Sequence, residues 1–196
     1  MGRKGFMWGA MLVTFAMLGS WDLTHGDKSS SAQTGIPPET VADYVHAVIE
    51  ADRTFYTVHV VERLQNKGIL AATENWRVAN TLPLPAQFLR ESSELAEKTG
   101  TKVRYRLISA WPINKQNGPA TEFERTGLEE VRKRPERAYT GYISSGSDRS
   151  FQAMYADRAV SQACIGCHNA HPSSSKRDFK LADVMGGIVI TIPMGR

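Results

Sequence analysis

The chain has two cysteines, and both lie in one five-residue motif, Cys164-Ile165-Gly166-Cys167-His168. The pattern C-x-x-C-H is the attachment signature of c-type haem. Two thiols three positions apart can form thioethers with both vinyl groups of one porphyrin, and the adjacent imidazole can bind the iron. The motif therefore predicts one covalent haem c, attached through Cys164 and Cys167, with His168 as the proximal iron ligand.

Three other uses of the two thiols compete with haem attachment. A thioredoxin-like dithiol needs a βαβ context with the first cysteine at a helix start, and it does not need His168. A zinc site built from Cys164, Cys167 and His171 has three spaced ligands and lacks a second ligand pair. A disulfide across two intervening residues is sterically poor and holds little of the chain together. Haem attachment is the interpretation that the sequence favours.

The first 26 residues are typical of an export signal. Arg3 and Lys4 precede an apolar stretch at residues 6–18, which is the order of a charged n-region and an apolar h-region. Small residues follow, and apolar character continues to Trp21, so a cleaved signal peptide and an N-terminal membrane anchor both stay open. Residues 1–26 thus predict a periplasmic location, either soluble or anchored to the inner membrane.

The composition excludes several classes of protein. With 41% hydrophobic and 22% charged residues among 196, the chain is typical of a globular protein and not of a disordered one. No apolar run is long enough to indicate a polytopic membrane protein. The net charge of +4 does not indicate nucleic-acid binding, because the densest basic cluster, at residues 129–137, is interleaved with glutamates.

After a Ser-, Gly- and Pro-rich linker at residues 27–38, helical and strand-like patterns alternate along the chain. Apolar residues at helical spacing predict a long helix at residues 39–67, which ends at Gly68. Later patterns predict helices at residues 85–98 and 121–134 and strands at 101–109, 139–144, 150–157 and 187–192, with a hairpin joining the middle two strands. A long helix followed by strands with one embedded helix indicates an α+β domain over residues 39–196.

The long helix carries a series of residues at spacings of three and four: Val41, Val45, Val48, Asp52, Phe55 and His59. This spacing predicts one packing face, and its heptad-like period also suits a homodimer formed through the helix. His59 lies at the centre of the predicted face, which makes it the candidate distal ligand of a haem iron. His46 is expected to point away from that face.

Other residues compete with His59 for the sixth iron position. They are His171, Met154 and Met185, and water or an empty position is a further alternative. His171 is so close in sequence to His168 that it would need a sharp chain reversal to reach the opposite haem face. Four polar side chains could hydrogen-bond the haem propionates: Arg104, Arg106, Asn114 and Asn117.

Three stretches carry a family resemblance: residues 111–119 (WPINKQNGP), 164–169 (CIGCHN) and 178–187 (DFKLADVMGG). They resemble exported single-haem proteins whose c-type haem domain has a PAS-like fold and also occurs as a sensor module ahead of signalling domains. The resemblance implies a PAS-like antiparallel sheet with flanking helices and maps the proximal haem residues onto the C-x-x-C-H motif. One branch of that family supplies a cysteine thiolate as the second axial ligand. This chain has no third cysteine, so it cannot do the same.

Two functions follow as expectations. The first is a periplasmic monohaem c-type cytochrome that transfers electrons or senses redox state, with two protein ligands on the iron. The second is a haem sensor that binds a gas or another small ligand at an open sixth position and acts through a separate partner protein. Neither the redox partner nor the signalling partner is specified by the sequence. An enzyme such as a peroxidase is not indicated, because no distal acid–base pair is apparent.

Overall fold

The computed structural model describes residues 35–195 of the chain. The predicted export segment at residues 1–26 and most of the predicted linker at residues 27–38 lie outside the described residues. Within the described part, no helix combines the length and the apolar character that a membrane crossing needs.

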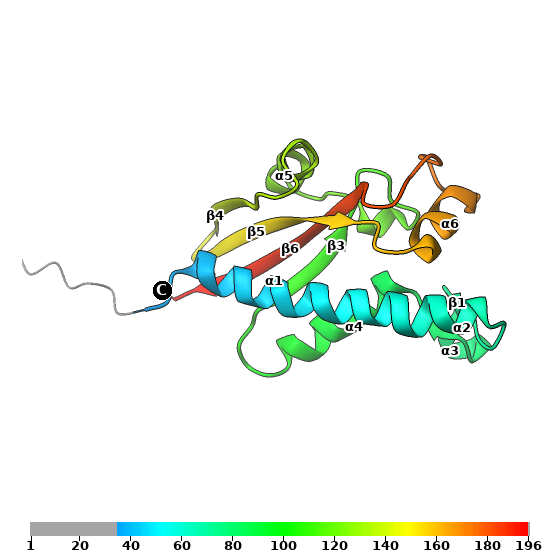
Figure 1. Ribbon diagram of the computed structural model, residues 1–196. Coiled ribbons are helices and arrows are strands. Elements are labelled where there is room, and N and C mark those ends of the chain that lie inside the picture. Colours follow the sequence, from blue (N-terminus) through cyan, green and yellow to red (C-terminus); the bar gives the residue numbers. More distant parts are fainter. Residues whose placement is uncertain (1–34, 196) are drawn as a thin grey trace, which may run out of the picture. The chain divides into compact units, whose positions relative to one another are not determined.

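The centre of the fold is a four-stranded antiparallel sheet with the order β3-β6-β5-β4 (Figure 1). Its strands are β3 (Arg104–Ile108), β4 (Tyr139–Ser145), β5 (Asp148–Arg158) and β6 (Val184–Met194). Strands β4 and β5 form the expected hairpin, with Gly146 at a φ of +59° in its turn. Strand β6 pairs with both β3 and β5, so the last strand of the chain lies in the middle of the sheet.

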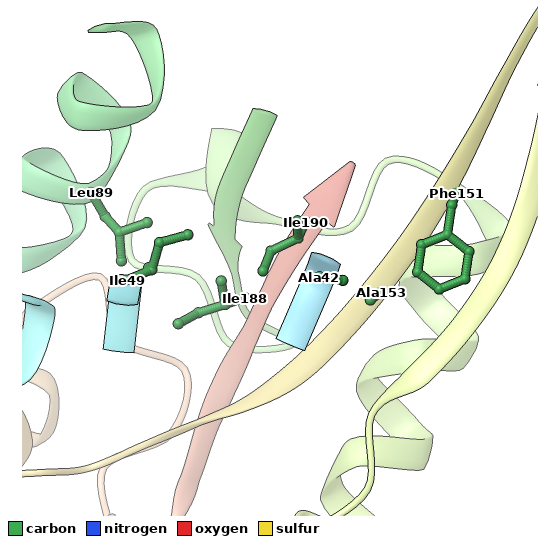
Figure 2. Close-up of a cluster of buried hydrophobic side chains, with 7 residues drawn as sticks. All are labelled: Ala42, Ile49, Leu89, Phe151, Ala153, Ile188 and Ile190. Atoms are coloured by element: carbon green, nitrogen blue, oxygen red, sulfur yellow. The ribbon is translucent and has the colours of Figure 1, made fainter. Parts of the chain in front are cut away.

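A continuous helical segment covers one face of the sheet. It consists of α1 (Pro38–Phe55), the π-helical stretch η1 (Tyr56–Glu62) and the short α2 (Arg63–Asn66). Ala42 and Ile49 of α1 pack with Leu89 of α4 (Pro85–Glu97). Figure 2 shows these side chains grouped over the sheet residues Phe151, Ala153, Ile188 and Ile190.

The predicted packing face of the long helix is wrong. Val48 and Phe55 are each 62% exposed, whereas the buried side chains of the helix are Ala42, Ile49, Arg53, Thr57 and Val61. The sheet covers the face that carries Ala42 and Ile49, whose small and branched side chains fit against β5 and β6. Beyond Phe55, the i→i+5 bonding of η1 widens each turn. Residues four apart therefore stay on the buried side of the helix, as Thr57 and Val61 do after Arg53.

Helix α5 (Glu122–Lys133) covers the opposite face of the sheet. It begins with a capping box, in which Thr121 accepts from the backbone N–H of Glu124 and Glu124 accepts from the backbone N–H of Thr121. Its Phe123, Leu128 and Val131 form a second core cluster with Ile108, Met154 and Val189 of the sheet. Neighbouring residues of β6 therefore contribute to opposite cores, as the two-residue period of a strand requires.

The remaining elements gather at one end of the sheet. They are the two-residue strands β1 (Ala72–Thr73) and β2 (Leu82–Pro83), which pair in parallel, α3 (Trp76–Ala79), the 3₁₀ turn η2 (Lys115–Asn117) and α6 (Gln162–Ala170). Helix α6 lies in the connection between the central strands β5 and β6.

Candidate functional site

Helix α6 carries the C-x-x-C-H motif. The helix begins after Ser161, whose hydroxyl accepts a hydrogen bond from the backbone N–H of Cys164 at 3.4 Å. A serine at this position satisfies a backbone donor that the helix cannot satisfy itself. Helical spacing then places Cys164, Cys167 and His168 within little more than one turn.

Hydrogen bonds hold α6 at both ends. At its start, the backbone N–H of Gln162 donates to the Glu62 carboxylate of η1 at 3.1 Å. At its end, the Asn169 side chain accepts from the backbone N–H of Phe179 at 3.0 Å and donates to the carbonyl of Phe179 at 2.9 Å. The motif is thus fixed between the long helical segment and the chain that leads into β6.

Beside α6 lies a cleft of about 1000 Å³. Its walls come from η1 and α2, the start of α4, the end of β3, the loop at residues 112–117 and α6 itself. Cys164, Cys167 and His168 all line it. A cavity of this size is at the upper end of the range for small-molecule and cofactor sites.

The two thiols and the imidazole are chemically available. Cys164 is half-buried and Cys167 is exposed, and neither forms a disulfide. Burial raises the pKa of the Cys167 thiol, and Glu74 and Cys164 raise it further. Burial also lowers the pKa of His168, an effect that His171 and Arg53 strengthen, so the neutral imidazole that can bind a metal is favoured.

His168 is held by a wall of aromatic side chains. Its ring meets Phe179 edge-on at 5.9 Å, and Phe179 meets Trp111 in the same manner at 5.6 Å. Its buried Nδ1 atom has no hydrogen-bond partner in the described part of the chain. Arg132 and Lys176 lie over the Trp111 ring at 4.6 and 5.5 Å and cover this wall from outside.

The structure does not bring His59 to the cleft. This residue lies on η1 with an exposed side chain, tilted against Phe55 at 5.0 Å between ring centroids, and it is not part of the cleft wall. His46 stacks on Tyr155 at 3.9 Å, also outside the cleft wall. His59 as the distal ligand stays a prediction, and its position gives that prediction no support.

The other sequence candidates divide between the cleft and the rest of the fold. His171 and Met185 line the cleft, whereas Met154 is fully buried in the core beneath α5. Asn114 and Asn117 also line the cleft. The two strand arginines do not: Arg104 pairs with Glu97 at 3.7 Å, and Arg106 donates to the carbonyl of Gly118 at 2.8 Å.

Sequence reasoning missed Arg53 and Asp157, which form a buried ion pair in the cleft wall. The distance between Arg53 Nη2 and Asp157 Oδ1 is 2.5 Å, and the two residues are 3% and 4% exposed. Although burial alone would lower the pKa of Arg53, the carboxylates of Asp157 and Glu50 raise it, so the guanidinium stays charged. Arg53 follows Ile49 by four residues, and this spacing could have placed it on the buried row.

Comparisons with known proteins agree with this architecture. The chain is similar to the crystal structure of the cyanobacterial heme-protein Tll0287, with a TM-score of 0.51 and 14% sequence identity over 82% of this chain and 99% of that chain. At this identity the similarity shows a shared fold. No curated protein matches the chain. A family model described as Tll0287-like matches residues 33–193, and the chain therefore belongs to the Tll0287-like family.

Proposed function

We propose that the chain binds one haem c covalently and acts as an exported monohaem cytochrome in electron transfer or redox sensing. The observation that carries this proposal is the arrangement of α6, which presents two thiols and a neutral imidazole to one cleft of about 1000 Å³. Cys164 and Cys167 are the thioether residues in this proposal, and His168 is the proximal ligand. The solved relative, whose description names a heme-protein, supports it.

The residues present fit such a group. Cys164 is half-buried and Cys167 exposed, which leaves both sulfur atoms accessible. The buried Nδ1 of His168 has no protein partner among the described residues, so the ring is not committed to another contact through that atom. When bound, haem iron supplies one-electron redox chemistry.

The chain's own residues would orient and enclose the cofactor. Phe179 limits the rotation of the His168 ring, and the Asn169 bonds to Phe179 hold both in one unit. Asn114 and Asn117 offer amide donors from the loop wall. The helical segment η1–α2 and the start of α4 restrict the access of water to the cleft.

A second function, binding of a gas or other small ligand at the iron, is favoured by a different observation. Among the described residues that line the cleft, His171 and Met185 are the side chains besides the motif that commonly bind haem iron. His171 Nδ1 accepts from the backbone N–H of Ser173 at 3.1 Å, and its Nε2 lies 3.6 Å from Glu74. Met185 is buried against Ala159 and Phe179. Because both side chains already have contacts within the protein, the sixth iron position would be left to an external ligand.

The attachment is tested by expression in a host that exports and matures c-type cytochromes. We expect red protein whose pigment resists acid–acetone extraction, and loss of covalent pigment in Cys164→Ser/Cys167→Ser. His168→Ala should alter the axial ligation, whereas the matched control His46→Gln, at a histidine outside the cleft wall, should retain the wild-type Soret band. Colourless or extractable wild-type protein would overturn the proposal.

Spectra of the reduced protein with and without CO distinguish the two functions. A six-coordinate spectrum that CO does not change favours electron transfer, and ready CO binding favours the sensor. His59→Ala and Met185→Leu then identify the sixth ligand. An unchanged ferric spectrum in His59→Ala removes His59 as a ligand, and the same criterion applies to Met185.

A further inference from the structure

Arg53 is a buried cation with donors that no other residue uses. Its side chain projects from the last turns of α1 into the cleft wall and is 3% exposed. Nη2 pairs with Asp157, while Nε and Nη1 have no hydrogen-bond partner in the described chain. The nearest further carboxylate oxygen, on Glu50, lies 4.0 Å from Nη1 and is also unpartnered.

The burial of the unpartnered Nε and Nη1 donors costs free energy unless another group accepts hydrogen bonds from them. A guanidinium has five N–H donors in a fixed fork, and a buried donor without an acceptor destabilises the fold. The hydroxyl of the neighbouring Thr57 donates to the carbonyl of Arg53 at 2.7 Å, and it forms no hydrogen bond with Nε or Nη1. The free donors therefore indicate an acceptor that is not part of the described chain.

The position of Arg53 in the cleft identifies the chemistry of that acceptor. Two cations line the cleft within the described residues, and the other, Arg90, is exposed and lies 3.9 Å from Glu94. Arg53 is therefore the cation that can meet a ligand away from water. In a buried place, charge-assisted hydrogen bonds to an anion are stronger than bonds to a neutral group.

We infer that Arg53 is the anion-holding residue of the cleft, with one of its unpartnered donors, on Nε or Nη1, bonded to a small anionic group beside the porphyrin. This inference rests on the proposed function, since the cleft must hold haem. Two sources can supply the group: a haem propionate, or an exogenous anion bound at the iron. Asp157 fixes the guanidinium in place through Nη2, and the donors on Nε and Nη1 stay without an acceptor in the described chain.

The test uses Arg53→Gln, Arg53→Lys and the matched control Arg104→Gln in the mature haem protein. Arg104 is an exposed arginine outside the cleft wall. Ferric protein is titrated with azide as the anionic probe and with imidazole as the neutral probe, and the Soret shift gives each affinity. Resonance Raman spectra report the propionate bending mode of the same samples.

An iron-bound anion predicts azide binding at least tenfold weaker in Arg53→Gln, with imidazole affinity changed less than twofold. Arg53→Lys, which keeps the charge and loses the fork, should show a smaller loss in azide affinity. A propionate partner instead predicts a shifted bending mode in both variants with no selective effect on azide. Arg104→Gln should match wild type in every measurement.

The inference is overturned if azide affinity and the bending mode are both unchanged. Arg53→Lys decides the matter if Arg53→Gln does not fold, because it leaves no buried carboxylate without a cation. A colourless wild-type protein refutes the proposed function itself. A red wild-type protein with insensitive Arg53 variants refutes the anion role alone.

Discussion

The two halves of the long helical segment differ in what they bury. The N-terminal half places Ala42 and Ile49 against the sheet, in a cluster that is entirely apolar. The C-terminal half continues the same row with Arg53 and Thr57, which face the cleft. Both halves bury polar atoms without partners in the described chain, His46 Nε2 and Glu50 Oε2 in the first half and Arg53 Nε and Nη1 in the second, but only those of Arg53 belong to a cation that lines the cleft. One helix thus divides stability and function along its length.

The largest expected effect compares one phenylalanine from each region. Phe151 is 1% exposed in the sheet cluster, and Phe179 is 3% exposed in a small cluster beside the cleft. Phe151→Ala should lower the free energy of unfolding by about 3–5 kcal/mol in urea titrations. Phe179→Ala should cost about 3 kcal/mol or less, because fewer buried side chains surround it, and should change the haem spectrum more. Equal spectral changes in both variants would remove the distinction between the regions.

A smaller loss is expected at the link between α6 and β6. Asn169→Ala removes both side-chain bonds to Phe179 and should lower the free energy of unfolding by about 1–2 kcal/mol. It should also broaden the Soret band by loosening the His168 wall. Ser175→Ala, an exposed change in the same loop region, is the control and should alter neither quantity.

His46 tests whether water is excluded from the contact between the N-terminal half of the helical segment and the sheet. Burial lowers the pKa of its imidazole below the usual 6.5, although Asp43 acts in the opposite direction. As the pH falls through 6.5, the unfolded chain takes up a proton that the native state resists, so stability should fall toward lower pH. Urea unfolding between about pH 8 and pH 5 should show this loss in wild type.

His46→Gln provides the comparison, because it leaves the half-buried Glu50 unchanged. Burial raises the pKa of Glu50, which contributes a pH dependence of the opposite sign. The difference between wild type and His46→Gln therefore isolates the histidine. Parallel pH profiles for the two proteins would show that the stacked ring on Tyr155 is not shielded from water.

The smallest effect on the monomer is expected on the outer face of α1. Tyr44, Val48 and Phe55 are 66%, 62% and 62% exposed, so Val48→Ser/Phe55→Ser should change the free energy of unfolding by about 0.5 kcal/mol or less. The predicted homodimer would use this face. Sedimentation should then show a wild-type dimer, a monomeric double variant and a dimeric Leu181→Ser control. Monomeric wild-type protein contradicts the homodimer prediction.

Local patterns in the sequence predicted much of the fold. Helices α4 and α5 lie within one residue of their predicted bounds, and the β4–β5 hairpin follows from its turn residues. Strand β6 is longer than the predicted 187–192, because it begins at Val184, before Gly186, and continues through Pro193 to Met194. A Cβ at Gly186 would lie 2.2 Å from the carbonyl oxygen of Ile108, so glycine is needed where β6 and β3 approach closely.

The candidate site was predictable only in part. The C-x-x-C-H motif is local, so its residues could be identified without the fold. The cleft wall depends on which face of α1 meets the sheet, and both faces carry apolar residues at helical spacing. The pattern placed His59 on the buried face because it chose the face of Val48 and Phe55, both of which are exposed, and His59 follows that face. The burial of Arg53 follows from its spacing to Ile49, but its pairing could not be predicted, because Asp157 lies on a distant strand.

The place of α6 in the chain has a consequence for maturation. No residue of α6 is buried, and neither large hydrophobic cluster includes one of its side chains. Strands β5 and β6 can therefore pair with each other although the helix between them contributes little to the packing of the sheet. If haem is attached as proposed, a polypeptide that has already folded would still expose both sulfur atoms, so folding of the scaffold and attachment of the cofactor would be separable events.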